Sequence, residues 1–317
     1  MFKRVCFYTL IVFLGILLVG RNFYFTGFAL DFFRWWLVGL LLIILLSYKK
    51  SQPRRLAVIT LVLILVEALS IQIASQGSPS FKPSEKVKVI TANVYFKNHH
   101  SQDDVKKVFD QEADIVCLQE YTRRHQLVAN KLSTYAYKHE LPHEGTHGYA
   151  LFSKYPIAQT KVLNNTSGLP IYVISELDIS GKKHLVVNAH IASPAIAFHK
   201  EGNMIRLLWE NEKMRRKQVE QLETYLSGQS IENIIMAGDM NTMPSEPLMR
   251  KLRNNWVDVY DYTNWSLGYN FPNSWRSKRP ITRLDYILVK GHIKPIGAQI
   301  VKSRASDHHF VIGEIGI

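Results

Sequence analysis

Apolar and polar residues follow two different patterns along this chain, and the change falls near residue 75. The first part holds three apolar runs, at residues 6–20, 32–48 and 56–74. The third run is long enough to cross a bilayer, and the second becomes so when residues 27–30 extend it. The pattern therefore predicts a membrane anchor of about three transmembrane helices in residues 1–75.

Positive charges predict how this anchor is oriented. They gather before the first run, at residues 3–4, and between the second and third runs, at residues 49–55. Because Lys and Arg favour the cytoplasmic side, we expect a multi-pass protein of the cell membrane whose later residues lie on the extracytoplasmic side. The first run also has the length of a signal-peptide core, so a cleaved or interfacial segment is an alternative there.

Short apolar and β-branched segments separated by polar ones characterise the rest of the chain. Ser, Pro and Gly in residues 76–85 predict a linker, and residues 86–317 have the size of one domain. Strands are predicted at 86–94, 114–118, 149–153, 171–177, 184–191, 234–238, 283–289 and 309–317, and helices at 103–111 and 203–226. This count predicts an α/β fold: a four-layer α/β sandwich of two stacked, mostly antiparallel sheets flanked by helices.

Polar residues gather where these strands end. The strand at 234–238 runs into Gly-Asp-Met-Asn, so Asp239 and Asn241 emerge two residues apart on the same side. A carboxylate there can orient or deprotonate a water, and an amide can donate to a phosphate oxygen. Alone, the same residues are equally typical of an Asx-rich turn.

Other strands repeat this design at or next to an end. Taken singly, each has a simpler structural explanation, since an acid after a strand is commonly a solvated loop residue and a histidine there is commonly a hydrogen-bonded core residue. The residues concerned are Asn93, Glu120, His190, Asp285, Asp307 and His308.

The charged and aromatic side chains of residues 86–317 fit more than one kind of partner. Residues 86–317 hold 30 Lys and Arg against 23 Asp and Glu, an excess that attracts nucleic acids and anionic lipids alike. Trp, Tyr and basic residues at 256–281 fit nucleotide stacking, a membrane interface, or packing of a long loop on its own sheet. The helix at 203–226 carries a basic face, which we expect to be solvated, at Lys213, Arg215, Arg216 and Lys217.

The polar motifs, taken in their order and spacing, resemble those of the endonuclease/exonuclease/phosphatase (DNase I-like) superfamily. That group includes pancreatic DNase, apurinic endonucleases, bacterial sphingomyelinases and inositol phosphatases. The resemblance covers nearly all of residues 86–317 and none of the anchor. It rests on N-V at 93–94, L-Q-E at 118–120, N-A-H-I at 188–191, G-D-M-N at 238–241, R-L-D-Y-I at 283–287 and S-D-H at 306–308.

The resemblance implies a divalent cation and a set of ligands for it. Glu120, with Asn93 and Asp307, would hold magnesium, with Mn²⁺ or Ca²⁺ as alternatives. Carboxylate and amide oxygens suit these hard ions, and Mg²⁺ keeps several waters while it touches a substrate phosphate.

The resemblance also implies catalytic roles. His308, hydrogen-bonded to Asp285, would face the scissile phosphate, and Asp239 would position or deprotonate the attacking water. Asn241 and His190 would donate to phosphate oxygens. Whether Asp239 or His308 is the base stays open. Position 190 is His, as in the DNase and sphingomyelinase branches, whereas apurinic endonucleases carry Tyr, which argues against abasic-site repair.

The expected function is therefore that of a membrane-anchored, divalent-metal-dependent phosphoester hydrolase. It would cleave phosphodiesters by in-line attack of an activated water, most simply as a nuclease. A phosphodiesterase acting on phospholipid or sphingolipid head groups is the alternative, and a catalytically inactive phosphate-binding module is an alternative of another class. The expected partners are the lipid bilayer and the phosphodiester substrate, and no protein partner can be inferred.

Overall fold

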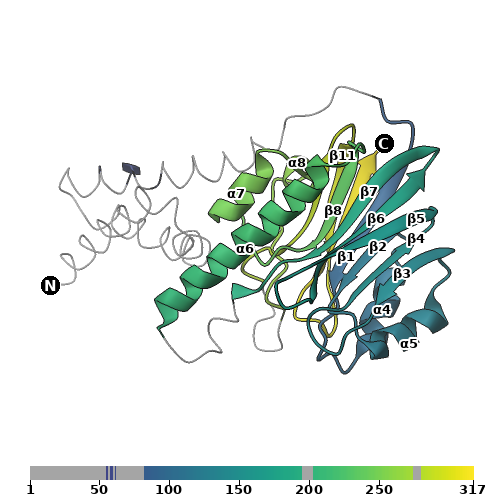
Figure 1. Cartoon of the computed structure of the whole chain (residues 1–317), viewed down its shortest axis with the longest axis horizontal. Coiled ribbons are helices and arrows are strands. Elements are labelled where there is room, and N and C mark those ends of the chain that lie inside the picture. The colour runs from purple at the N-terminus through teal and green to yellow at the C-terminus, as the bar shows by residue number, and fades with distance from the viewer. Residues whose placement is uncertain (1–54, 56–57, 60, 62–81, 195–202, 274–279) are drawn as a thin grey trace. The chain divides into compact units, whose positions relative to one another are not determined.

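The computed structural model describes residues 82–194, 203–273 and 280–317, with Arg55, residues 58–59 and Leu61 (Figure 1). The chain separates into two compact units, one of Gly77–Thr242 and Asn255–Ile317, the other of Met1–Gln76 and Met243–Asn254. Apart from residues 58, 59 and 61, the three apolar runs lie outside the described residues, as do residues 76–81 of the predicted linker. Among the described residues, no helix has the length and apolar character needed to cross a membrane.

The larger unit is built on two six-stranded sheets. The first has the order β11-β12-β1-β2-β4-β3, formed by Lys294–Val301, Phe310–Gly316, Lys86–Asn93, Ile115–Gln119, Tyr149–Ser153 and Tyr137–Leu141. The second has the order β5-β6-β7-β8-β10-β9, formed by Ile157–Asn164, Pro170–Ile179, Lys182–His190, Ile234–Asp239, Asp285–Lys290 and Val257–Asp258. Each sheet contains one parallel pair, β1 with β2 and β7 with β8, and its other pairs are antiparallel.

Apolar side chains at alternate strand positions fill the space between the sheets. The same alternation determines which polar residues face that space. Val87 and Val89 of β1 share a buried cluster with Ala237 of β8. Because side chains on one face of a strand recur every two residues, the same inward rows continue to Asn93 and Asp239. The rows that build the apolar core thus end in polar residues at one edge of the sandwich.

Helices cover the outer faces of the sheets. A second buried cluster joins Val105 and Val108 of α4 and Ala129 of α5 to Ile90 and Ala92 of β1, so these two helices cover the first sheet. The long helix α6 lies along the second sheet (Figure 1). The helices of this unit are α4 (Ser101–Phe109), α5 (Arg123–Leu132), α6 (Met204–Ser227) and α8 (Val259–Thr263).

The described part of the other unit, near residue 250, is built on one short helix, α7 (Pro247–Arg253). Pro247 occupies its first turn, where the missing N–H leaves no hydrogen bond unmade. The Arg253 guanidinium Nη1 donates to the Pro244 carbonyl at 2.7 Å, which closes the segment on itself.

The predicted α/β sandwich of two mostly antiparallel sheets with flanking helices is confirmed in the described residues. The strand predicted at 149–153 matches β4, and the helix predicted at 203–226 begins at Met204, with the Asn203 side chain accepting from the Arg206 amide. The sequence pattern did not indicate α5, α7, α8, β3, β5, β9 or β11. The boundaries at 75 and 85 stay predictions.

Candidate active site

The predicted site residues of the second sheet are neighbours through strand pairing. In the register of β7 with β8, His190 lies opposite Asp239, and in the register of β10 with β8, Asp285 lies opposite Asp239. Asp239 is therefore flanked on both sides in its own sheet. Side chains at paired positions stand close enough to interact directly.

Asn93 brings the first sheet to the same point. Its amide Nδ2 donates to Glu120 Oε1 and to Asp239 Oδ2, both at 3.1 Å, and so connects the two sheets. Its Oδ1 accepts from the Tyr95 amide at 3.0 Å, and Glu120 Oε2 accepts from the Phe96 amide at 3.0 Å. Asn93 thus turns its nitrogen toward Glu120, and ligation of a metal through Oδ1 requires the amide to rotate.

Backbone strain accompanies these residues. Tyr95, Glu120 and Asn241 have φ values of 58°, 57° and 45°, in the left-handed region that residues other than glycine rarely adopt. Such conformations cost on the order of 1 to 3 kcal/mol and cluster at functional sites. The loops after β1, β2 and β8 are therefore bent to aim side chains inward.

His308 is held by a buried carboxylate. Its Nδ1 lies 2.6 Å from Asp285 Oδ2, which also accepts from Asn270 Nδ2 at 2.8 Å, and its Nε2 lies 3.7 Å from Asp239 Oδ2. Burial lowers the pKa of His308, but the carboxylates of Asp285 and Asp239 outweigh it and hold that pKa well above its ordinary value. Burial raises the pKa of Asp285 to about 6 although His308 opposes the shift. The two carboxylates therefore favour the charged form of the His308 ring.

His190 presents one nitrogen to the cluster. Its Nδ1 lies 2.9 Å from the Thr146 carbonyl, which can only accept, so Nδ1 donates to it. Its Nε2 lies 3.6 Å from Asp239 Oδ2 and 3.9 Å from Glu120 Oε1. The carbonyl thus fixes the ring so that Nε2 faces both acids.

Asn241 completes the turn after Asp239. Its backbone amide donates to Asp239 Oδ1 at 2.8 Å, and its side-chain Nδ2 donates to the Ile191 carbonyl at 3.0 Å. The first bond fixes the carboxylate of Asp239, and the second engages one of the two amide hydrogens that were expected to face a phosphate.

Asp307 has a buried carboxylate oxygen, Oδ1, that is not hydrogen-bonded in the described residues. Burial raises the pKa of Asp307. His308 opposes this shift, while the charges of Glu120 and Asp239 add to it. A divalent cation would satisfy this oxygen and offset the repulsion among the three acids, so the residues fit such an ion.

Asp239, Asp285 and His308 form a second group of possible ligands, with ligand atoms within 4.8 Å of one another. His308 Nδ1 is hydrogen-bonded to Asp285, and a nitrogen that carries a proton cannot bind a metal. We therefore interpret these three residues as a hydrogen-bonded group that lies beside the proposed cation ligands.

Arg215 was misjudged from the sequence. It was expected on a solvated basic face, but it is completely buried and its Nη2 donates to the Asn241 carbonyl at 2.6 Å. It also contacts the Thr242 hydroxyl. The spacing of the apolar residues could have predicted this burial, because Leu208 and Val219 place position 215 on the buried face of the helix.

Asn270 and Gln119 are functional candidates that sequence reasoning missed. Asn270 Oδ1 accepts from the Leu284 amide at 3.0 Å while its Nδ2 holds Asp285. Gln119 Nε2 donates across the sheets to Asn188 Oδ1 at 2.8 Å, beneath the cluster. Asn270 lies in a loop without periodicity, so no sequence signal pointed to it.

The first part of the aromatic segment at 256–281 has one of its expected roles, packing on its own unit. Trp256 and Tyr260 are buried and pack the segment on its own unit, whereas Trp265 is 79% exposed. Residues 274–279 lie outside the described residues. Packing therefore explains the first part of the segment.

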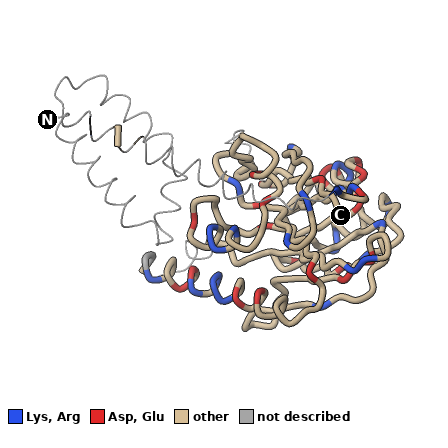
Figure 2. The backbone as a smooth tube through the Cα atoms, turned by 90° about the horizontal axis from the view of Figure 1, so that it is seen from above, with Lys and Arg blue, Asp and Glu red and all other residues tan. Residues whose placement is uncertain are grey.

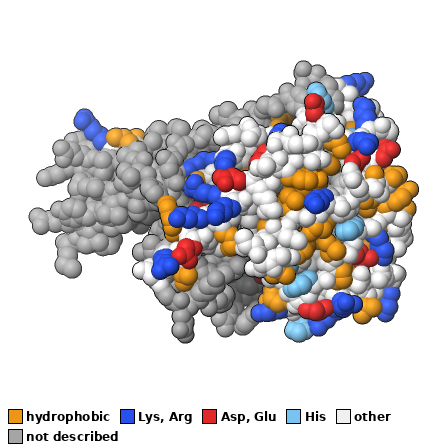
Figure 3. All heavy atoms as spheres, in the orientation of Figure 1, with side chains coloured by type: hydrophobic (Ala, Val, Ile, Leu, Met, Phe, Trp, Pro, Cys, Tyr) orange, Lys and Arg blue, Asp and Glu red, His pale blue; other side chains and the backbone are white. Residues whose placement is uncertain are grey.

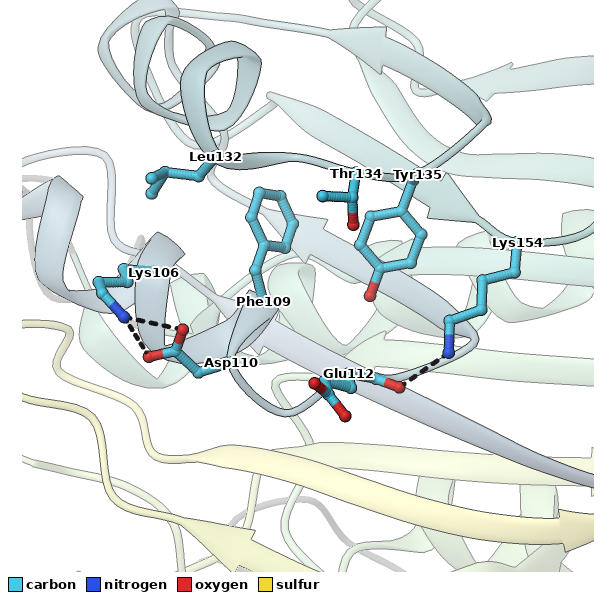
Figure 4. Close-up of a pocket in the computed structure, with 8 residues that line it drawn as sticks. All are labelled: Lys106, Phe109, Asp110, Glu112, Leu132, Thr134, Tyr135 and Lys154. Atoms are coloured by element: carbon cyan, nitrogen blue, oxygen red, sulfur yellow. Dashed lines mark hydrogen bonds and ion pairs between the residues drawn. The ribbon is translucent and has the colours of Figure 1, made fainter.

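A cavity of about 520 Å³ lies apart from this cluster, lined by Lys106, Phe109, Asp110, Glu112, Leu132, Thr134, Tyr135 and Lys154 (Figure 4). Lys106 Nζ donates to both oxygens of Asp110, and Lys154 Nζ donates to the Glu112 carbonyl. Its two lysines are thus engaged, and none of the predicted site residues lines it.

Two mixed sheets that bring buried carboxylates, an amide and a carboxylate-paired histidine to one edge define a metal-dependent phosphoester hydrolase. The chain belongs to the endonuclease/exonuclease/phosphatase family, whose sequence profile matches residues 90–308. An enzyme is thereby established over the inactive binding module. No curated protein sequence matches the chain significantly.

Solved structures share the fold. D. rerio TDP2 complexed with single-strand DNA product is 15% identical, over 74% of this chain and 100% of that one, with a TM-score of 0.59. An endonuclease/exonuclease/phosphatase from Bacteroides vulgatus is 15% identical over 74% and 100%, with a TM-score of 0.56. Beta toxin from Staphylococcus aureus is 18% identical over 72% and 99%, with a TM-score of 0.53. At these identities the likeness establishes the fold.

Proposed function

We propose that this protein cleaves phosphodiesters by in-line attack of a water, with nucleic acid as its substrate. One observation carries the proposal. A single oxygen, Oδ2 of Asp239, lies 3.1 Å from Asn93 Nδ2, 3.6 Å from His190 Nε2 and 3.7 Å from His308 Nε2. A carboxylate oxygen that accepts from Asn93 and faces two imidazole nitrogens is placed to hold a water beside a bound phosphoryl group.

The roles follow from these contacts. Asp239 orients and deprotonates the water, because the imidazolium of His308 has no free lone pair with which to act as base. His308 donates from Nε2 to the phosphate as negative charge shifts, while Asp285 keeps its Nδ1 proton in place. His190 and Asn241 are the further proposed donors.

Glu120, Asp307 and Asn93 are the proposed ligands of a divalent cation, Mg²⁺. Such an ion, when bound, neutralises charge on a phosphate and orients it for attack. The unpartnered Oδ1 of Asp307 and the proximity of Glu120 support this assignment. Phe96 fixes the other oxygen of Glu120 through its backbone amide, which leaves Oε1 directed at the cluster.

Nucleic acid is the proposed substrate class. The excess of positive charge in residues 86–317 favours a polyanion, and the TDP2 structure was determined with a DNA product. Acidic and basic residues are interspersed along the described backbone and on the face seen in Figure 3 (Figures 2 and 3). The apolar runs before residue 75 favour the second candidate, a phosphodiesterase of lipid head groups.

A substrate panel tests the proposal. Purified full-length protein with Mg²⁺ is incubated with single- and double-stranded DNA, RNA, and phospholipid and sphingomyelin vesicles, beside an Asp239→Asn control. We expect nucleic acid to be cleaved, with a rate that falls steeply as salt rises. Cleavage of the vesicles alone would support the lipid candidate, and cleavage of nothing would overturn the hydrolase mechanism proposed.

Residues 1–75 are the proposed multi-pass anchor in the cell membrane, with the catalytic domain on the extracytoplasmic side. The apolar runs and the charges at residues 49–55 support this arrangement. Lys183 is exposed, so a Lys183→Cys variant in intact cells reports its side. We expect labelling by a membrane-impermeant maleimide before permeabilisation. Labelling only afterwards would contradict it. The parent protein, which has Cys6 and the buried Cys117, gives the background labelling.

A further inference from the structure

A buried carboxylate outside the proposed machinery holds the loop that leads to Asp307 and His308. Asp104, in the first turn of α4, is completely buried. Its Oδ1 accepts from the Arg304 amide at 2.9 Å, and its Oδ2 accepts from the amides of Ala305 at 3.1 Å and Ser306 at 2.7 Å. The Ser303 hydroxyl lies 3.0 Å from Oδ1 and 3.1 Å from Oδ2.

The same carboxylate reaches the loop after β1. Asn98 Nδ2 donates to Asp104 Oδ2 at 3.1 Å and to the Val94 carbonyl at 3.3 Å. The two loops also meet directly, because the Ser306 hydroxyl donates to the Asn93 carbonyl at 2.6 Å and accepts from the His308 amide at 3.1 Å. Asp104 is thus the point at which both loops of the cluster are fastened to a helix.

Closing a turn does not require a buried charge. Taking a carboxylate out of water is costly, and a neutral side chain can cap the same amides. A charged acceptor makes stronger hydrogen bonds and defines their geometry more tightly, and the first turn of a helix favours an anion. Asp104 accepts hydrogen bonds from backbone amides of residues 304–306 and does not pair with a cation in the described part of the chain. Its negative charge therefore acts to hold this loop in place.

We propose that Asp104 is a positioning residue of the active site, which sets the loop at 303–306 so that Asp307 and His308 reach the cluster. Its consequence for turnover rests on the proposed function, whereas its effect on the His308 geometry does not. Because a displacement of about 1 Å at a reacting group can cost about 10²-fold in rate, loosening this loop lowers kcat more than it changes KM.

The experiment compares Asp104→Asn with Asp103→Asn in the full-length protein. Asp103 is exposed one residue earlier in the same turn, so its variant removes the same charge without touching the loop. We expect kcat to fall about 10²-fold in Asp104→Asn with KM little changed, and both to be retained in Asp103→Asn. The second readout is the proton NMR signal of His308 Nδ1–H in histidine-labelled protein, which reports the short bond to Asp285 without any turnover.

The outcomes separate the possibilities. A shift or loss of the Nδ1–H signal together with the fall in kcat supports the proposal, and retention of both in Asp104→Asn overturns it. If Asp104→Asn does not fold, Ser303→Ala decides in the same way, because it removes one donor to Asp104. If the parent protein cleaves no substrate, the proposed function fails and the NMR signal alone still decides whether Asp104 positions His308.

Discussion

His308 Nδ1 and Asp285 Oδ2 lie 2.6 Å apart with both residues buried, so the ring is fixed by a charged partner. We predict that Asp285→Asn lowers kcat by about 10²-fold or more, because the neutral amide no longer provides the negative charge that raises the pKa of His308 and favours its charged form. Steady-state kinetics on the cleaved substrate measure it. The matched control is Asp110→Asn, which alters an exposed ion pair with Lys106. A variant at 285 as active as this control would contradict the role of the pair.

Asp239 is predicted to be the base. Asp239→Asn keeps an acceptor for the Asn241 amide but loses the charge, and we expect kcat to fall about 10²-fold or more while circular dichroism stays that of the parent protein. His308→Ala is expected to lower kcat on the same scale through loss of a donor. Turnover that persists in Asp239→Asn and disappears in His308→Ala would transfer the role of base to the histidine.

Glu120 is predicted to govern the response to Mg²⁺. In Glu120→Gln one ligand charge is lost, so the Mg²⁺ concentration for half-maximal activity should rise about tenfold or more. Mg²⁺ should also raise the thermal unfolding temperature of the parent protein more than that of the variant, since a ligand stabilises the state that binds it. Glu144→Gln, which changes an exposed acid outside the cluster, is the control. Equal Mg²⁺ responses in all three proteins would refute Glu120 as a ligand.

Much of the candidate site could be predicted from the sequence, because alternation along a strand determines which side chains face the same way. A polar residue that continues an apolar row at a strand end must face the space between sheets, which is how Asn93, His190 and Asp239 were found. Their relation to each other could not be derived from pattern alone, because strand order joins β1 to β12 and β8 to β10 across long stretches of sequence. The resemblance to a family supplied that step.

The contacts that the sequence concealed are tertiary and come from loops or buried polar groups. Asp104 reads as an ordinary acid in the first turn of a helix, yet its partners lie some two hundred residues later. Arg215 looks solvated until the apolar stripe of α6 is followed around the helix. Asn270 sits in a loop whose conformation no periodic pattern encodes. Hydrogen bonds of this kind depend on the finished fold, so local pattern does not reveal them.

His125 is predicted to make stability depend on pH. It is completely buried in the first turn of α5, and its Nδ1 accepts from the Thr122 amide at 3.1 Å, so the folded state requires the neutral ring. Burial, aided by Arg124, lowers the pKa of His125 from 6.5 to about 4. Between these values the unfolded chain binds more protons, so the free energy of unfolding should fall as pH drops, by up to about 3 kcal/mol.

His125→Gln isolates this effect, because glutamine keeps an acceptor for the capping bond to Thr122 but does not titrate. Urea unfolding of both proteins at pH 7.5 and 4.5 measures it. The contribution of His125 is fully present above pH 6.5 and is lost as pH falls toward 4, so the parent protein should lose more stability than the variant between the two conditions. Since the other titrating groups are common to both proteins, an equal loss in the two would show that His125 is not held neutral by the fold.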